Sequence, residues 1–146
     1  MTKVLAVLDT MWGTQAGRPV PRIFKISRTN HSGRRLYSLI STLDNASLWV
    51  TNSCPIMVSS ASEHGTPDPK FLNESLVYIQ DKLCPEIILV CGKIAQATFE
   101  QAEYRRRMTP TVIEIPHPAA RKTWTSAYIA EVQSLIRCKV KGEQTK

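Results

Sequence analysis

The sequence contains few cysteines, and they are not placed for metal binding. The four thiols are widely separated and form no C-x-x-C pair: Cys54, Cys84, Cys91 and Cys138. Zinc and iron–sulfur sites need clustered ligands, so we expect neither a metal nor another cofactor. Thiols without disulfide patterning are typical of a reducing compartment. This favours a cytoplasmic protein, either associated with a nucleoid or, if viral, in the host cytoplasm.

Long apolar runs are absent as well. No stretch approaches the roughly 20 apolar residues that a membrane-spanning helix needs. Residues 1–8 hold one lysine and a short apolar run that ends at Asp9, unlike a secretory signal. We therefore expect no membrane partner. The loop that follows contains Gly13 and Gly17 but no G-x-G-x-x-G pattern, which argues against a dinucleotide-binding enzyme.

Acidic residues are scarce relative to basic ones. The chain has 12 aspartates and glutamates against 19 lysines and arginines, a formal net charge of +7. Cations gain affinity for nucleic acids by releasing the counterions condensed on phosphates, so this excess favours a polyanionic partner such as DNA. Apolar residues make up 42% of the chain and charged residues 21%, which indicates a folded domain rather than a disordered segment.

The order of apolar patterns predicts alternating strands and helices. A length of 146 residues suits one domain, which we assign to residues 1–140, with a polar tail at 141–146; we expect a monomer. Strands are expected at 4–8, 23–27, 48–51, 87–90 and 111–115, and helices at 32–43, 69–83, 94–104 and 124–138. Ser32 and Asp68 are the candidate N-caps. This alternation predicts a three-layer α/β/α fold around a central, mostly parallel four-stranded sheet.

Three polar residues, Asp9, Asn52 and His117, stand where predicted strands end. Because ligands of open α/β sheets bind at the carboxyl ends of the strands, we expect their loops to converge. A carboxylate can orient water or face a cationic sugar, an amide can read a base edge, and an imidazole can stabilise charge on a departing base. Each residue also has a structural explanation: a turn cap for Asp9, an Asx-turn for Asn52 and packing beside Pro118 for His117.

These residues lie in a series of motifs that resembles the uracil-DNA glycosylase superfamily. The segment Val7–Trp12 (VLDTMW) stands at the place of the family's GQDPYH motif, and His117–Arg121 (HPAAR) at the place of its HPS motif. Between them come a strand with Phe24, a strand that leads to Asn52, and a P-x-hydrophobic-G-x-x-A segment at 85–95. The ordered combination carries the resemblance, which spans nearly the whole chain.

The resemblance implies a DNA glycosylase, which hydrolyses the bond between the sugar and a flipped-out uracil or modified pyrimidine and leaves an abasic site. The DNA could be single- or double-stranded. The implied site residues are Asp9 and His117 for catalysis, Met11, Trp12, Phe24 and Asn52 for substrate binding, and Ser32, Arg121 and Lys122 for DNA contact. Core packing is the structural alternative for Phe24, and a solvated loop position for Arg121.

The first motif departs from the family pattern. Val7 and Thr10 replace the opening Gly and the Pro after the acidic residue, Met11 replaces a Tyr that excludes thymine, and Trp12 replaces His. A pocket floored by Met11 and Trp12 differs in shape, so the substrate need not be plain uracil. Two alternatives remain: a catalytically silent family member that binds DNA or a protein partner, and a small Rossmann-like enzyme that acts on free nucleotides.

Overall fold

The computed structural model describes residues 2–60, 63, 65–118 and 123–144, of which 140–144 are described by their backbone alone. Its strands form one parallel sheet in the order β2-β1-β3-β4. They are β1 (Thr2–Leu8), β2 (Ala46–Asn52), β3 (Ile87–Cys91) and β4 (Thr111–Ile115). The helices are α1 (His31–Ile40), α2 (Pro69–Lys82), α3 (Lys93–Gln101), the 3₁₀ helix η1 (Glu103–Arg107) and α4 (Ser126–Gln144).

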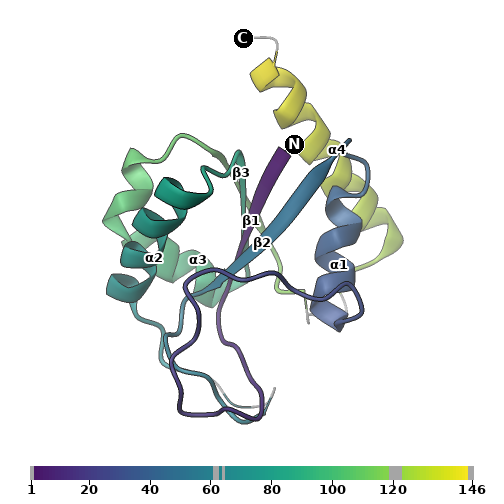
Figure 1. Ribbon diagram of the computed structural model, residues 1–146. Coiled ribbons are helices and arrows are strands. Elements are labelled where there is room, and N and C mark those ends of the chain that lie inside the picture. Colours follow the sequence, from purple (N-terminus) through teal and green to yellow (C-terminus); the bar gives the residue numbers. More distant parts are fainter. Residues whose placement is uncertain (1, 61–62, 64, 119–122, 145–146) are drawn as a thin grey trace.

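Helices cover both faces of the sheet, α1 and α4 on one face and α2 and α3 on the other (Figure 1). Alternate residues of β1 pack into the two layers. Val4, Ala6 and Leu8 face α1 and α4, whereas Leu5 and Val7 face α2 and α3. Because both faces are covered, β1 is buried from Val4 onward, as a continuous apolar run predicts. The predicted three-layer α/β/α fold with a parallel four-stranded sheet is confirmed.

Side chains just before two helices cap their first turns. Asp68 accepts a hydrogen bond of 3.0 Å from the amide of Lys70 and caps α2, as predicted. The predicted cap of α1 at Ser32 is wrong, because the Asn30 side chain accepts hydrogen bonds from the amides of Ser32 and Gly33. The sequence offers several capping residues in a row here, and Asn30 is the one placed to reach both amides.

Residues 23–27 do not form the predicted strand. In the described part of the chain, Phe24 alone among them pairs with the sheet, through hydrogen bonds of 3.0 and 2.8 Å exchanged with Val50 of β2. Side chains hold the segment instead. Cations of this region lie over aromatic rings of the neighbouring elements: Arg22 over Phe71 at 5.4 Å, Lys25 over Trp49 at 4.6 Å and Arg28 over Tyr37 at 4.0 Å.

Three helices end elsewhere than their apolar periodicity predicts. α1 stops at Ile40, three residues before its predicted end at residue 43. α3 stops at Gln101, and the chain continues into η1. α4 starts at Ser126 and continues past Cys138 to Gln144, through a stretch rich in lysine, glutamate and glutamine, which are good helix formers. The assignment of residues 1–140 to one domain stays a prediction. No helix in the described ranges is long and apolar enough to cross a membrane.

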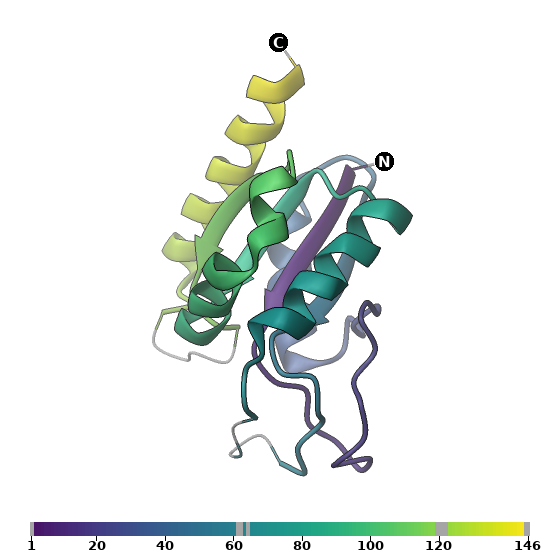
Figure 2. The same ribbon diagram turned by 90° about the vertical axis from the view of Figure 1, so that its left-hand side faces the viewer.

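Two long loops, 9–30 and 53–68, leave the carboxyl ends of β1 and β2 and lie together beyond the edge of the sheet (Figures 1 and 2). Residues 55–58 run between two parts of the first loop. Val58 forms a parallel bridge with Trp12, and Ile56 forms an antiparallel bridge with Pro19. Main-chain bonds therefore fix the loop that follows Asp9 against the loop that follows Asn52.

Candidate functional site

The carboxyl edge of the sheet carries a cavity of about 520 Å³, here called the Asp9 cavity. The register of β1 and β2 pairs Leu8 with Asn52, so Asp9 begins its loop beside that amide. His117 follows β4, on the far side of β3. The cavity is lined by every predicted site residue that the structure describes: Asp9, Met11, Trp12, Phe24, Ser32, Asn52 and His117. Arg121 and Lys122 lie outside the described residues.

The side chains of Asp9 and His117 contact each other inside this cavity. His117 Nε2 lies 3.2 Å from Asp9 Oδ1, and the two side chains are 31% and 19% exposed. The amide of Thr10 donates a hydrogen bond of 2.7 Å to the same oxygen. Burial alone would raise the pKa of Asp9, but the hydrogen bond and charge of His117, with the Thr10 amide, lower it below its ordinary value. Asp9 is therefore a carboxylate at neutral pH.

The main chain at His117 is fixed from three sides. Gly92 has a φ of 88°, and a Cβ there would lie 3.1 Å from the Cβ of His117, so glycine leaves the space that the imidazole residue occupies. Trp124 Nε1 donates a hydrogen bond of 2.8 Å to the carbonyl oxygen of His117. Arg35 of α1 donates to the carbonyl oxygen of Pro118, and its guanidinium lies 5.9 Å from the Trp124 ring. Neighbouring elements thus hold the His–Pro dipeptide in place.

Asn52 presents a buried amide that has no hydrogen-bond partner among the described residues. The residue is 1% exposed, and neither its side-chain oxygen nor its nitrogen hydrogen-bonds with any described residue. The Asx-turn that would explain it structurally is therefore not formed. Buried polar groups are nearly always paired, and leaving one unpaired is costly. An unpaired donor and acceptor at a cavity wall are placed to bind a ligand that offers the complementary pair.

The apolar wall of the cavity includes Phe24 and Ile26. Phe24 also packs against the core, so its two proposed roles do not exclude each other. The position of this wall depends on close packing of two main-chain segments. A Cβ on Gly33 of α1 would lie 2.0 Å from the carbonyl oxygen of Ser27. Only glycine lets the start of α1 come this near to the segment that carries Phe24.

Three further polar residues line the cavity that sequence patterns do not single out: Thr10, Asn30 and Glu63. Thr10 ties the two loops together, since its hydroxyl donates to Cys54 Sγ at 3.3 Å and accepts from the Gly65 amide at 3.4 Å. Glu63 hydrogen-bonds with the Ser59 hydroxyl. It is the one acidic residue between positions 53 and 67, which is the signal that could have drawn attention to it.

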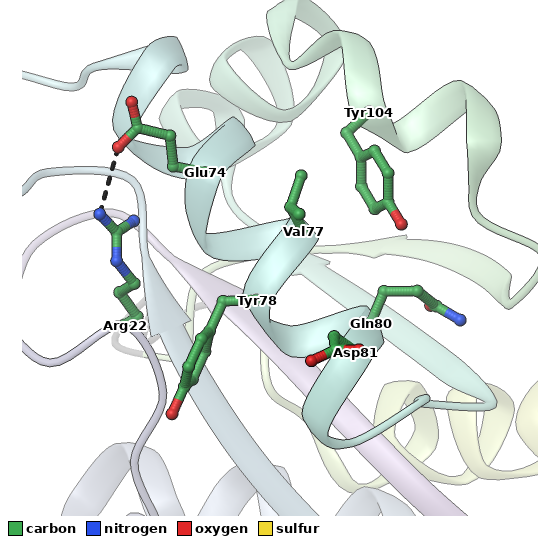
Figure 3. Close-up of a pocket in the computed structure, with 7 residues that line it drawn as sticks. All are labelled: Arg22, Glu74, Val77, Tyr78, Gln80, Asp81 and Tyr104. Carbon is green, nitrogen blue, oxygen red and sulfur yellow. Dashed lines mark hydrogen bonds and ion pairs between the residues drawn. The ribbon is translucent and has the colours of Figure 1, made fainter.

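A second hollow, of about 730 Å³, lies along the exposed side of α2 (Figure 3). Its lining includes an ion pair of 3.1 Å between Arg22 and Glu74. Tyr78 and Tyr104 also line the hollow. This hollow contains none of the predicted site residues. Among the described residues there is also no group of three or more His, Cys, Asp or Glu side chains that could hold a metal ion.

Comparison with known proteins bears on what this edge of the sheet does. No curated protein matches the sequence significantly. Residues 17–137 match the protein family described as the uracil DNA glycosylase superfamily. The matched range includes Phe24, Asn52 and His117 and begins after the altered segment 9–12. The fold, the ordered motifs and this match agree, and the chain belongs to the uracil DNA glycosylase superfamily, a family of DNA glycosylase type whose members act on DNA.

Proposed function

We propose that this protein is a DNA glycosylase that hydrolyses the N-glycosidic bond of a uracil or modified pyrimidine flipped out of DNA. The observation that carries the proposal is the meeting of a carboxylate, an imidazole and an unpaired buried amide in one cavity. These are the residues that the family motifs single out by position, and the net charge of +7 suits a DNA partner.

Binding of the base uses the polar and apolar walls of the Asp9 cavity. The amide of Asn52 accepts from and donates to the pyrimidine edge, which relieves its own lack of partners. Phe24 stacks on the face of the base. Extrusion costs a few kcal/mol in lost pairing and stacking, and it is cheapest for bases that are already mispaired or unpaired.

Cleavage follows from the chemistry of Asp9 and His117 inside the cavity. The bond between C1′ and the base nitrogen breaks, and its electron pair leaves with the base. Asp9 faces the resulting positive sugar and orients a water molecule, whose oxygen adds to C1′ while its proton passes to the Asp9 carboxylate; the departing base takes up a proton from solvent. His117 faces the negative charge on the base. The products are the free base and an abasic site.

A second candidate function is recognition without cleavage. It is favoured by the altered first motif, in which Thr10, Met11 and Trp12 follow Asp9, and by a family match that starts only at residue 17. In this alternative the same cavity binds an extruded base and the protein stays on the DNA. Turnover separates the two: in the first case the wild type cleaves and substitution of Asp9 slows it, and in the second case neither protein cleaves.

The test is a cleavage assay on end-labelled single strands and duplexes that carry uracil, 5-hydroxymethyluracil or other altered pyrimidines. Asp9→Asn should slow abasic-site formation by roughly 100-fold or more. The matched control is Asp81→Asn, which makes the same change at an exposed carboxylate on α2 and should leave the rate unchanged. If the folded, DNA-bound wild type forms no abasic site on any substrate, the glycosylase proposal fails and recognition without cleavage takes its place.

A further inference from the structure

The side chains of the Asp9 cavity are arranged by depth. Asn52, at 1% exposure, forms the floor. The Asp9 and His117 side chains lie higher, at 19% and 31%. Trp12, at 58%, stands at the mouth. A base whose edge reaches Asn52 and whose glycosidic bond lies near Asp9 therefore shares the cavity with an exposed indole.

Trp12 differs from the other tryptophans of the chain in being uncovered. Lys25 lies 4.6 Å above the Trp49 ring, and Trp124 is 8% exposed. No ring or cation of the described residues covers Trp12 in this way. The exposed indole beside the cavity offers a large flat surface on which a flat ligand can stack.

The main chain holds Trp12 in a fixed position although its side chain is open. Val58 accepts a hydrogen bond of 3.0 Å from the amide of Gly13 and donates one of 3.0 Å to the carbonyl of Met11. The indole is thus presented from a backbone bonded on both sides. A stacking platform that is ordered in advance loses little conformational freedom when a flat ligand binds.

We propose that Trp12 stacks on an unpaired base next to the extruded one, which gives the protein a preference for single-stranded or locally opened DNA. The inference rests on the proposed binding of an extruded base in the Asp9 cavity. The ring of a base offers an apolar face to an indole irrespective of sequence. In a duplex the neighbouring base stays paired with the opposite strand and does not reach the indole, so the contact forms only where pairing is lost.

The test measures binding to undamaged oligonucleotides and so does not depend on turnover. Wild-type tryptophan fluorescence should be quenched by a mixed-sequence single strand, and less by the same sequence in a duplex. Trp12→Ala should weaken single-strand binding by about 5- to 150-fold, the loss of one base stack, and Trp12→Phe, which keeps a ring, by less. The matched control is Trp49→Phe, which removes an indole already covered by Lys25 and should retain both quenching and affinity.

Three results would overturn the inference: single-strand affinity unchanged in Trp12→Ala, quenching that persists in Trp12→Phe, or equal affinity for single strand and duplex. Unchanged affinity would assign the exposed indole to another partner, such as a protein. Thermal melts of each variant exclude loss of folding as the cause. If the stacking signal is present while no substrate is cleaved, the stacking site stands and the glycosylase proposal fails. If substrate is cleaved while Trp12→Ala binds as tightly as wild type, the glycosylase proposal stands and the stacking site fails.

Discussion

Replacement of Asn52 by leucine should make the protein more stable and less active at the same time. The amide is buried, both of its polar atoms lack partners among the described residues, and it lines the Asp9 cavity. Leucine has a similar branched shape without the polar atoms. In the free protein the substitution removes two unpaired groups, and in the complex it removes the groups proposed to bind the base.

The size of the effect follows from the number of unpaired atoms. A buried polar group without a partner costs about 1–3 kcal/mol. At the lower end of that range, the two atoms of Asn52 together give about 2 kcal/mol. For a domain of about 150 residues, a gain of 1 kcal/mol raises the melting temperature by about 2–4 °C. We therefore expect Asn52→Leu to melt roughly 4–8 °C higher than the wild type.

The neighbouring strand position supplies a matched control. The Thr51 hydroxyl is also buried and has no partner in the described part of the chain, but Thr51 is on the opposite face of β2 and does not line the cavity. Thr51→Val should raise the melting temperature by roughly 2–4 °C and leave activity intact. Asn52→Leu should lower the cleavage rate by roughly 100-fold or more, as loss of a positioned hydrogen-bond donor does. Thermal melts and the cleavage assay measure both. An Asn52→Leu protein that melts no higher than wild type, or cleaves equally fast, would refute the reasoning.

Three further predictions concern Asp9 and His117, the proposed catalytic pair. Gly92→Ala should destabilise the fold by about 1–2 kcal/mol and displace His117, because the position has a φ of 88° and a Cβ there meets the Cβ of His117. Urea unfolding measures the loss of stability, and the cleavage assay measures the effect of the displacement. A variant that cleaves at the wild-type rate would contradict the prediction. Trp124→Phe keeps an aromatic ring but loses the donor to the His117 carbonyl, so kcat should fall roughly tenfold with KM unchanged; a change in KM alone would count against a positioning role. The pKa of Asp9 is lowered in the folded state, so its contribution to stability is present above its unfolded pKa and is lost as pH falls through the folded pKa. Below about pH 4 the free energy of unfolding should therefore fall more steeply in wild type than in Asp9→Asn, and parallel urea-unfolding curves would argue against the contact between Asp9 and His117.

The sequence predicts the sheet well because each parallel strand carries an intrinsic signal. A strand buried on both faces needs a continuous apolar run, and β1 and β3 have one. The polar residue that ends such a run marks the carboxyl edge, which is why Asp9 and Asn52 could be placed beside one another. Residues 23–27 show the limit of this reasoning, since cation–aromatic contacts hold them rather than a strand ladder.

The parts of the site that escape prediction depend on contacts between distant segments. Glu63 reaches the cavity because loop 53–68 pairs with loop 9–30, and pairing of irregular loops has no periodic signature. The contacts that hold His117 and Pro118 leave no sequence pattern either, because Trp124 and Arg35 bind main-chain carbonyls, which every residue has. Side-chain types alone do not reveal such contacts; the folded geometry does.

The position of Gly92 between the catalytic candidates has a consequence for how the site can change. Asp9 and His117 follow strands that are not neighbours, since β3 runs between β1 and β4. Two strand spacings of about 4.8 Å separate the ends of these strands. Gly92 follows the intervening strand and has no side chain that would fill the space beside His117. The distance between the ends of these two strands is set by the strand spacing of the sheet, which changes in the loops do not alter. Changes in either loop can therefore alter the shape of the proposed base-binding cavity. The distance between the ends of β1 and β4 is set by the sheet and stays the same.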